Sequence, residues 1–394
     1  MTTTVPTTAT TTPTATLRVA HLGHSTAYGG AELALVRMLA ASDGRWEGVL
    51  VLPQGSDLGP FAGLDPAGVL RVGPSHRAGP GARSGAVSAL AGVVTLVCTA
   101  VALRRSPALR ADVVHTNTTR AAAYGALLGR GRGKLVVHLR DLLTVDALGR
   151  YGFHALGLAL RRADGVVANS AATLASARPY LPPGVPTLVL PSPLGLDAVR
   201  ARDRGAAPAA GEPKVVGMVA RLAAWKGQEL LLEAFAGAYG GGSRTRLRLV
   251  GAAHFGDGDY AARLRARAAA LGVADRVELP GHVTDVAGEI AAMDVCVQAS
   301  TLPEPLGQNV LQYLALGRPT VVADAGGPLE WVRDGENGLV FRSGDVGSLA
   351  AVLGRLADPA LRDRLAAGAR ATTVPTDVEV AAAFARFLSE VADR

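Results

Sequence analysis

A carboxylate, a tight glycine turn and the start of a helix follow one another closely in the second half of this sequence. Glu304 precedes Pro305 and Gly307, and an apolar helical stretch begins near Gln308. The first N–H groups of a helix have no intrahelical acceptor, and the helix dipole is positive at that end. The run therefore predicts an anion-binding site with a carboxylate beside it.

Two cations occupy a similar position earlier in the same half. Arg221 follows a strand predicted at residues 215–219, and Lys226 precedes a helix predicted from Gly227. Cations at the start of a helix are unfavourable by themselves, because the dipole there is already positive. A bound anion removes this conflict, so we expect Arg221 and Lys226 to hold one.

The elements that must position these residues alternate along the chain. Short apolar runs alternate with helical stretches in both halves, which is typical of parallel sheets with crossover helices. We predict an α/β protein with two doubly wound, Rossmann-like domains whose strand ends face a central cleft. The predicted strands are residues 17–22, 48–52, 112–115, 134–139, 165–168 and 187–190, followed by 215–219, 246–250, 276–279, 295–298, 320–322 and 338–341.

Changes in composition mark the predicted domain boundaries. Residues 1–16 are rich in Thr and lack the basic and apolar regions of a signal peptide, so we expect a disordered tail. Residues 200–213 are charged and then rich in Ala, Pro and Gly, as in a linker. The predicted domains are therefore residues 17–199 and 214–375. A final helix at 376–394 is expected to pack back on the first domain.

The overall charge and the cysteines limit the kinds of ligand. The formal net charge is +7, which favours phosphorylated or otherwise anionic partners. Basic runs interleaved with aromatic residues are missing, so we expect no nucleic-acid binding. Cys98 and Cys296 lie in apolar runs and are predicted to be buried, reduced thiols of a cytoplasmic protein. We expect no metal site: Asp257-Gly258-Asp259 precedes a helix and is interpreted as helix capping.

Residues 86–103 form the most apolar stretch of the chain. They are almost long enough to span a bilayer, but they are rich in small residues. We interpret them as a helix packed on a sheet, with peripheral membrane contact as the alternative.

Several motifs resemble those of retaining GT-B glycosyltransferases, in particular glycosyltransferase family 4. Residues 217–222 and 225–227 look like the G-R-L…K-G block of that family, and residues 324–330 match its D-x-G-G-x-x-E block. The run from Glu304 to Gln312 resembles the E-x7-E signature. The resemblance covers nearly the whole chain, from about Leu17 to Ala392, and implies a GT-B fold and a nucleotide-diphosphate sugar as substrate, without a further cofactor.

The resemblance also implies roles for individual residues. Glu304, Arg221 and Lys226 are the predicted catalytic residues: Glu304 would bind hydroxyls of the sugar, and the two cations would stabilise the departing diphosphate. The predicted donor-binding residues are Gly29, Gly30, Gly307, Gln308, Asn309, Gln312, His282 and Val283.

Gln312 departs from the family pattern, which usually has Glu there to bind the nucleotide ribose. An amide accepts hydrogen bonds through one atom and donates through the other, so Gln312 cannot accept from both ribose hydroxyls. Three explanations are open: an altered nucleotide contact, a deoxyribose donor, or drift.

The acceptor is expected to bind the first domain. His115, Asn117, Arg140 and Asp141 lie at predicted strand ends and are the acceptor-side candidates. Arg140 stands where many family members have His, so a histidine that positions the sugar is not expected here.

We therefore predict a bacterial, cytoplasmic enzyme that either binds the membrane peripherally or does not bind it. It would transfer a sugar from a nucleotide-diphosphate donor to an acceptor hydroxyl of a glycan, glycolipid or natural product, with retention and without metal. Two alternatives are a GT-B sugar-nucleotide epimerase and a non-catalytic sugar-nucleotide-binding or membrane-associated assembly protein.

Overall fold

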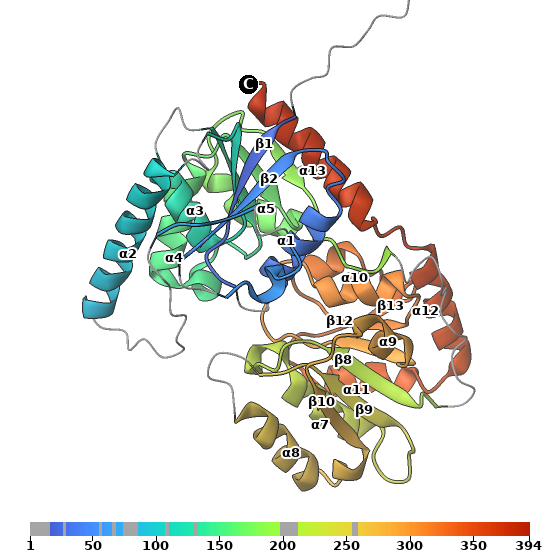
Figure 1. Cartoon of the computed structure of the whole chain (residues 1–394). Coiled ribbons are helices and arrows are strands. Elements are labelled where there is room, and N and C mark those ends of the chain that lie inside the picture. The colour runs from blue at the N-terminus through green and yellow to red at the C-terminus, as the bar shows by residue number, and fades with distance from the viewer. Residues whose placement is uncertain are drawn as a thin grey trace, which may run out of the picture.

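Two parallel β-sheets, each with helices on its faces, make up the computed structural model of the chain (Figure 1). The structure describes residues 16–26, 29–54, 57–64, 68–73, 86–106, 110–128, 133–197, 212–253 and 259–394. The predicted tail lies outside these residues except for Thr16, as does most of the predicted linker.

The first sheet has the strand order β3-β2-β1-β4-β5-β6-β7, and all of its strands are parallel. Its central strands read as nearly continuous apolar runs, as expected where helices cover both faces. The strands are β1 (Arg18–Leu22), β2 (Glu47–Leu52), β3 (Val69–Arg71), β4 (Val113–Thr116), β5 (Lys134–Leu139), β6 (Gly165–Ala168) and β7 (Thr187–Val189).

The second sheet has the order β10-β9-β8-β11-β12-β13 and is also parallel throughout. The strand order changes direction between β1 and β4 in the first sheet and between β8 and β11 in the second. Open α/β sheets bind ligands at such a switch point, at the C-terminal ends of the strands. The strands are β8 (Val215–Val219), β9 (Arg246–Val250), β10 (Val277–Gly281), β11 (Val295–Gln298), β12 (Thr320–Ala323) and β13 (Gly338–Phe341).

The helices connect successive strands. In the first unit they are α1 (Gly30–Ala40), α2 (Ala86–Arg105), α3 (Thr119–Ala126), α4 (Val145–Leu160) and α5 (Ala171–Ala177). The second unit has α7 (Gln228–Ala238), α8 (Tyr260–Ala270), α9 (Val286–Ala291), α10 (Gln308–Ala315), α11 (Val346–Arg355) and α12 (Pro359–Ala371), and the chain ends in α13 (Asp377–Ala392).

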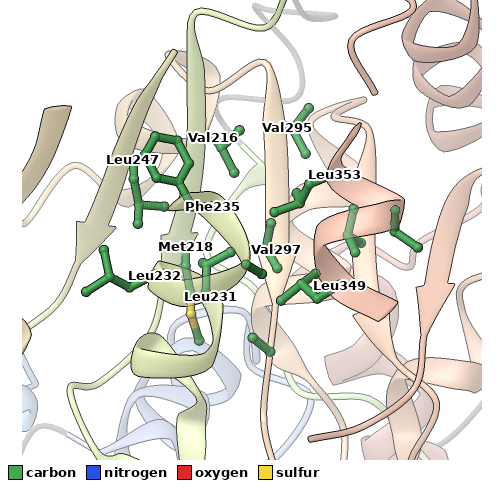
Figure 2. Close-up of a cluster of buried hydrophobic side chains, with 14 of the residues drawn as sticks. Val216, Met218, Leu231, Leu232, Phe235, Leu247, Val295, Val297, Leu349 and Leu353 are labelled. Atoms are coloured by element: carbon green, nitrogen blue, oxygen red, sulfur yellow. The ribbon is translucent and has the colours of Figure 1, made fainter. Parts of the chain in front are cut away.

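A buried apolar cluster joins the second sheet to the helices on one face. Figure 2 shows Val216 and Met218 of β8 beside Phe235 of α7, with Leu349 and Leu353 of α11 next to Val297 of β11 in the same cluster. These side chains are at most 1% exposed. This packing fixes β8 and β11, the two strands whose ends carry the candidate site.

Helix α13 returns to the first sheet (Figure 1). Phe384, Phe387 and Val391 pack in one cluster with strand residues such as Val113. A Cβ at Gly165 would lie 2.6 Å from Val391 Cγ2, so a glycine on β6 permits the close approach of the helix.

Three histidines form a hydrogen-bonded chain under α13. His21, His115 and His138 lie on adjacent strands and are at most 2% exposed. His21 Nδ1 is 2.9 Å from His115 Nδ1, and His115 Nε2 is 3.2 Å from His138 Nδ1. Burial lowers the pKa of His21 to about 3 and holds the pKa of the other two well below the usual value.

The direction of this chain follows from its first donor. Trp46 Nε1 can only donate, so His21 Nε2, at 3.0 Å, accepts. In neutral rings, His21 Nδ1–H then donates to His115, and His115 Nε2–H donates to His138. His138 Nε2 therefore carries the last proton, and this buried atom has no hydrogen-bond partner among the described residues.

The α/β prediction of two doubly wound, parallel sheets is confirmed, and most predicted strand bounds agree within two residues. Strand β3 and helices α3, α4, α5 and α12 were not predicted: β3, α3 and α5 are short, α12 is rich in Ala and charged residues, and α4 is interrupted at Gly149, whose φ of 67° is not helical. The prediction for Cys98 was wrong: this residue is exposed, because α2 turns one of its apolar faces outward. Cys296 is buried as expected.

Helix α2 is the segment for which membrane contact was considered. Within the described part of the chain, no helix combines the length and the apolar character needed to cross a bilayer. Val94, Val97 and Val101 of α2 are nevertheless 53%, 49% and 41% exposed.

The buried histidines predict acid sensitivity. Their pKa values in the folded protein lie below the value of 6.5 for an ordinary histidine, so the unfolded chain binds more protons as the pH falls. Stability is therefore lost below about pH 6.5, on the order of 1–2 kcal/mol per histidine by about pH 5. Denaturant unfolding at about pH 6.5 and about pH 5 measures this loss. Between these two pH values, His138→Leu should lose less free energy of unfolding than wild type.

The matched control for this measurement is His154→Leu, which replaces an exposed histidine on α4. It should keep the wild-type pH dependence. Equal pH dependence in wild type and His138→Leu would show that the buried chain does not titrate on unfolding.

Candidate functional site

The loop after β8 brings Lys226 to the end of β11. A short 3₁₀ helix over Ala224–Lys226 ends at Gly227, which has a φ of 78°. A Cβ at Gly227 would lie 1.9 Å from Ala299 O, immediately after β11. Glycine is therefore required both for the left-handed turn and for the close approach of the two loops.

Lys226 and Glu304, predicted separately as site residues, form an ion pair. Lys226 Nζ lies 2.5 Å from Glu304 Oε1, and Ser300 Oγ donates to the same oxygen at 2.6 Å. The two charged side chains are only 18% and 7% exposed. Lys226 Nζ also lies 4.1 Å from the centroid of the Trp225 ring. The ammonium group is thus fixed between a carboxylate and an aromatic face.

Two glycines of the D-x-G-G-x-x-E block support the Glu304 loop. Gly326 pairs with Glu304 in an isolated parallel bridge, and Gly327 N donates to Glu304 O at 2.8 Å. A Cβ at Gly326 would lie 2.3 Å from Glu304 O, and one at Gly327 would lie 2.4 Å from Pro305 O. The two glycines of the block therefore allow the backbone of the Glu304 loop to pack directly against the loop after β12.

The start of α10 completes this side of the site. Gly307 has a φ of 73° and is the N-cap of α10. The Asn309 side chain donates to Val219 O at 3.1 Å, which ties the helix start to the end of β8. Asn309 can therefore contribute its backbone N–H to an anion, but its side chain is already engaged within the protein.

Arg221 lies at the end of β8 and is exposed. Its carbonyl accepts from Gln228 Nε2 at 2.8 Å, which fixes the backbone of the loop. The guanidinium group is thus free to turn toward an anion beside Lys226 while its Cα stays in place.

The glycine loop of the first unit faces α10. A Cβ at Gly30 would lie 3.9 Å from Gln308 Oε1, which places the start of α1 opposite the start of α10. Gly29 is the N-cap of α1 and has an extended backbone. Two helix N-termini therefore point into the same region from the two units, where the predicted donor residues Gly29, Gly30 and Gln308 meet.

Buried polar groups surround Arg140 at the edge of the first sheet. Arg140 Nε donates to Asn117 Oδ1 at 3.0 Å, and its Nη1 donates to Ser192 Oγ at 2.9 Å. Burial lowers the pKa of Arg140 to about 10, against the nearby charges of Glu32 and Asp141, which raise it. Asp141 accepts from Thr119 Oγ1 at 3.2 Å and is itself exposed.

Glu32 is a residue of this region that the sequence did not single out. It is 7% exposed, and burial raises the pKa of its carboxyl group, whereas Arg140 opposes that shift. The only available signal was its place in the third position of α1, next to the glycine pair.

The structure does not bring His115 to this site. Its side chain is buried in the histidine chain under α13, so this arrangement gives the predicted acceptor-side role of His115 no support. Side chains alternate across a sheet, and His115 points to the face covered by α13, whereas Asn117 lies beyond the end of β4.

His282 and Val283 lie in the loop between β10 and α9. His282 is exposed, Val283 packs against a buried cluster, and Asp285 caps α9 by accepting from Gly288 N at 2.8 Å. Their predicted role in donor binding stays a prediction.

Gln312 is buried and makes a contact that no motif predicted. Its Nε2 donates to Leu194 O at 3.2 Å, in the segment that leaves the first sheet. The predicted ribose contact is neither made nor tested by this arrangement.

Glu330 joins the two units. Its carboxylate accepts from Ala171 N and Ala172 N, at 2.9 and 2.8 Å, at the start of α5. Glu330 ends the 3₁₀ helix over Gly327–Glu330. The prediction missed this contact because it depends on the arrangement of two units that are far apart in sequence.

The predicted cations of the site are Lys226 and Arg221, and Lys226 is paired with Glu304. Among the described residues, no three or more His, Cys, Asp or Glu side chains are grouped as metal ligands would be. Asp259 stands at the N-cap of α8 but makes no side-chain capping hydrogen bond there, so the capping interpretation fails for it. Asp257 lies outside the described residues.

Two family models match the chain. One, described as glycosyl transferases group 1, covers residues 199–372, and the other, described as glycosyl transferase 4-like domain, covers residues 29–193.

Curated relatives match part of the chain. LpsE of Rhizobium meliloti, a lipopolysaccharide core biosynthesis glycosyltransferase, is 36% identical over 181 residues, which are 46% of this chain and 50% of LpsE. The D-inositol 3-phosphate glycosyltransferase of Acidothermus cellulolyticus is 37% identical over 194 residues, 48% of this chain and 42% of that protein. The chain thus spans about half the length of the curated relatives it matches.

A solved structure matches nearly the whole chain. HepE of Anabaena, crystallised with UDP and glucose, has a TM-score of 0.76 and 27% identity, and the match covers 95% of this chain and 99% of HepE. The sucrose-phosphate synthase of Thermosynechococcus elongatus, at 21% identity and a TM-score of 0.72, shares the fold.

The Lys226–Glu304 pair predicts a coupled loss of stability. Lys226→Met leaves a nearly buried carboxylate with Ser300 Oγ alone, and should cost ~1–3 kcal/mol in urea unfolding. The double variant Lys226→Met, Glu304→Gln should recover much of this loss, because the uncompensated charge is gone. Additive losses in the two single variants and their combination would contradict a direct interaction.

Proposed function

Because the chain belongs to the GT-B glycosyltransferases of the family 4-like type, we propose that it transfers a sugar from a nucleotide-diphosphate donor to an acceptor hydroxyl. We further propose that the reaction retains the anomeric configuration and needs no metal ion. One observation carries the proposal: Lys226 is held against Glu304, just before α10 begins, and Arg221 lies in the same loop after β8 as Lys226.

The proposed donor site assigns one task to each group. Glu304, a hydrogen-bond acceptor, would bind sugar hydroxyls. Lys226, Arg221 and the first N–H groups of α10 would bind the diphosphate. Because charge accumulates on the leaving phosphate in the transition state, these contacts strengthen as the bond breaks.

The proposed step is balanced without a further reactant. The bond between the anomeric carbon and the phosphate oxygen breaks, and a bond from the acceptor oxygen to the same carbon forms on the same face. The acceptor proton goes to the departing phosphate oxygen, and the nucleoside diphosphate leaves. Positive charge from Arg221 and Lys226 takes the place that a metal ion has in other transferases.

UDP-hexoses are the first donors to test. HepE, which resembles this chain over nearly its full length, was crystallised with UDP and glucose. The acceptor would lie on the first unit, near Asn117, Arg140 and Asp141. A glycan or lipid-linked sugar is the proposed acceptor class, since LpsE acts in lipopolysaccharide core biosynthesis.

The exposed face of α2 is the proposed membrane contact. Val94, Val97 and Val101 recur at helical spacing on this face and are followed by Arg104 and Arg105 at the end of the helix. Apolar side chains next to arginines favour an interface of anionic lipid. Such a contact would hold the first unit near a lipid-linked acceptor.

Turnover should depend on Lys226. We expect Lys226→Met to lower kcat by about 100-fold or more, the usual effect of removing one fixed charge from a transition state. The measurement is acceptor-dependent release of nucleoside diphosphate from UDP-, GDP-, dTDP- and ADP-sugars. Lys214→Met is the matched control, because Lys214 is an exposed lysine just before the opposite end of β8.

The outcomes distinguish the competing functions. Release of an epimerised sugar without acceptor would identify an epimerase. Tight donor binding without turnover across all donors and diverse acceptors would identify a binding protein. A β-linked product from an α-linked donor, detected by NMR, would contradict retention.

Membrane contact is tested by sedimentation with lipid vesicles. Val97→Asp should reduce binding to anionic vesicles about 10-fold, because a charge enters the apolar face. Val378→Asp, at an exposed valine of α13, should not. Equal sedimentation of both variants with wild type, or no sedimentation of wild type, would contradict the proposed contact.

A further inference from the structure

The chain crosses between the two units twice, and the two crossings lie against each other. The first crossing leaves β7 through residues 190–197, and the second enters α13 through residues 374–377. Asp377 Oδ1 accepts from Leu194 N at 2.6 Å, and its Oδ2 accepts from Gly195 N at 2.9 Å. In return, Asp377 N donates to the carboxylate of Asp197 at 2.9 and 3.0 Å.

This reciprocal set of hydrogen bonds, which we call the crossover joint, consists of residues 194–197 and Asp377. Arg37 of α1 borders the joint, because Arg37 Nη1 donates to Pro193 O at 3.3 Å. A Cβ at Gly195, where φ is 73°, would lie 2.7 Å from Arg37 Nε. The joint is therefore closely packed as well as hydrogen bonded.

Gln312 enters the crossover joint from α10. Its Nε2 donates to Leu194 O, while Leu194 N is already bound by Asp377, so both polar groups of Leu194 are engaged. Gln312 is 6% exposed and Asp377 is 9% exposed. We propose that Gln312 is a positioning residue that fixes the two units relative to each other by donating this hydrogen bond.

The proposal explains why an amide is present at this position. Leu194 O is an acceptor, and a carboxylate has no proton to donate to it. A Glu at 312 would also add a third carboxylate to a region where burial and Asp197 already raise the pKa of Asp377, and where Arg37 is the cation that opposes this shift. Gln312 is thereby assigned to the joint rather than to a ribose.

The joint lies one helical turn from the donor site. Gln312 and Gln308 are four residues apart on α10, so their side chains lie on the same face. Gln308 faces Gly30 of the first unit at the N-terminal end of the helix. A shift of the joint would therefore change the distance between the glycine loop and the start of α10.

The inference rests on the proposed function for its effect on turnover, but the joint itself can be tested without turnover. Gln312→Glu should lower the unfolding temperature and alter the change in radius of gyration that UDP produces in small-angle X-ray scattering. Gln312→Met, which removes the donor without adding charge, should have a smaller effect. Gln54→Glu, at an exposed glutamine, should behave like wild type.

Activity adds a separate readout. Gln312→Glu should reduce kcat about 5- to 100-fold at saturating donor, the usual range for coupling between sites, while the Kd for UDP changes less than about threefold. Asp197→Asn combined with Gln312→Glu should recover part of kcat, because one negative charge is removed from the joint while the amide oxygen can still accept from Asp377 N.

Two results would overturn the assignment. UDP binding at least about tenfold tighter in Gln312→Glu, with unchanged scattering, would make Gln312 a ribose residue. Unchanged stability, scattering and turnover would show that its hydrogen bond has no positioning effect. If wild type transfers no sugar while Gln312→Glu still alters stability and scattering, the proposed function fails and the joint stands.

Discussion

The ion pair between Lys226 and Glu304 is the interaction on which the rest of the candidate site depends. A cation from the loop after β8 and a carboxylate from the loop after β11 can meet only if both loops approach closely. Gly227 and Gly326 permit this, since a Cβ at either would collide with a backbone carbonyl. The ion pair therefore requires glycine at both motif positions as well as the two charged residues.

Parallel topology places that pair opposite the first unit. In a parallel sheet all strand C-termini lie on one edge, and the connecting loops and helix starts gather there. The two sheets present these edges to each other, as the proximity of Gly30 to Gln308 shows. Glu330 and Gln312 both make hydrogen bonds from the second unit to segments that belong to or leave the first.

The sequence predicted the fold and the residues around the ion pair more completely than the contacts between the units. Alternating apolar runs indicated the strands, and helix starts next to Arg221, Lys226 and Glu304 indicated the anion site. These signals are local. The burial of His115 under α13 was not foreseen, because position at a strand end does not specify which face of the sheet a side chain occupies.

Contacts between distant segments had no local signal. Gln312 differed from the family pattern, but its hydrogen bond to Leu194 O could not be foreseen without knowing that the two chain crossings lie together. The carboxylate of Glu330 was part of a recognised motif, yet its partners at Ala171 and Ala172 belong to the other unit. Long-range polar contacts of this kind depend on how two domains dock.

A crystal structure with bound UDP tests the central claim most directly. The account predicts that an oxygen of the distal phosphate lies about 3 Å from Lys226 Nζ and within hydrogen-bond reach of the first N–H groups of α10. Arg221 should turn toward the same phosphate. A diphosphate bound elsewhere, with the Lys226–Glu304 pair unchanged and without contact to the nucleotide, would contradict it.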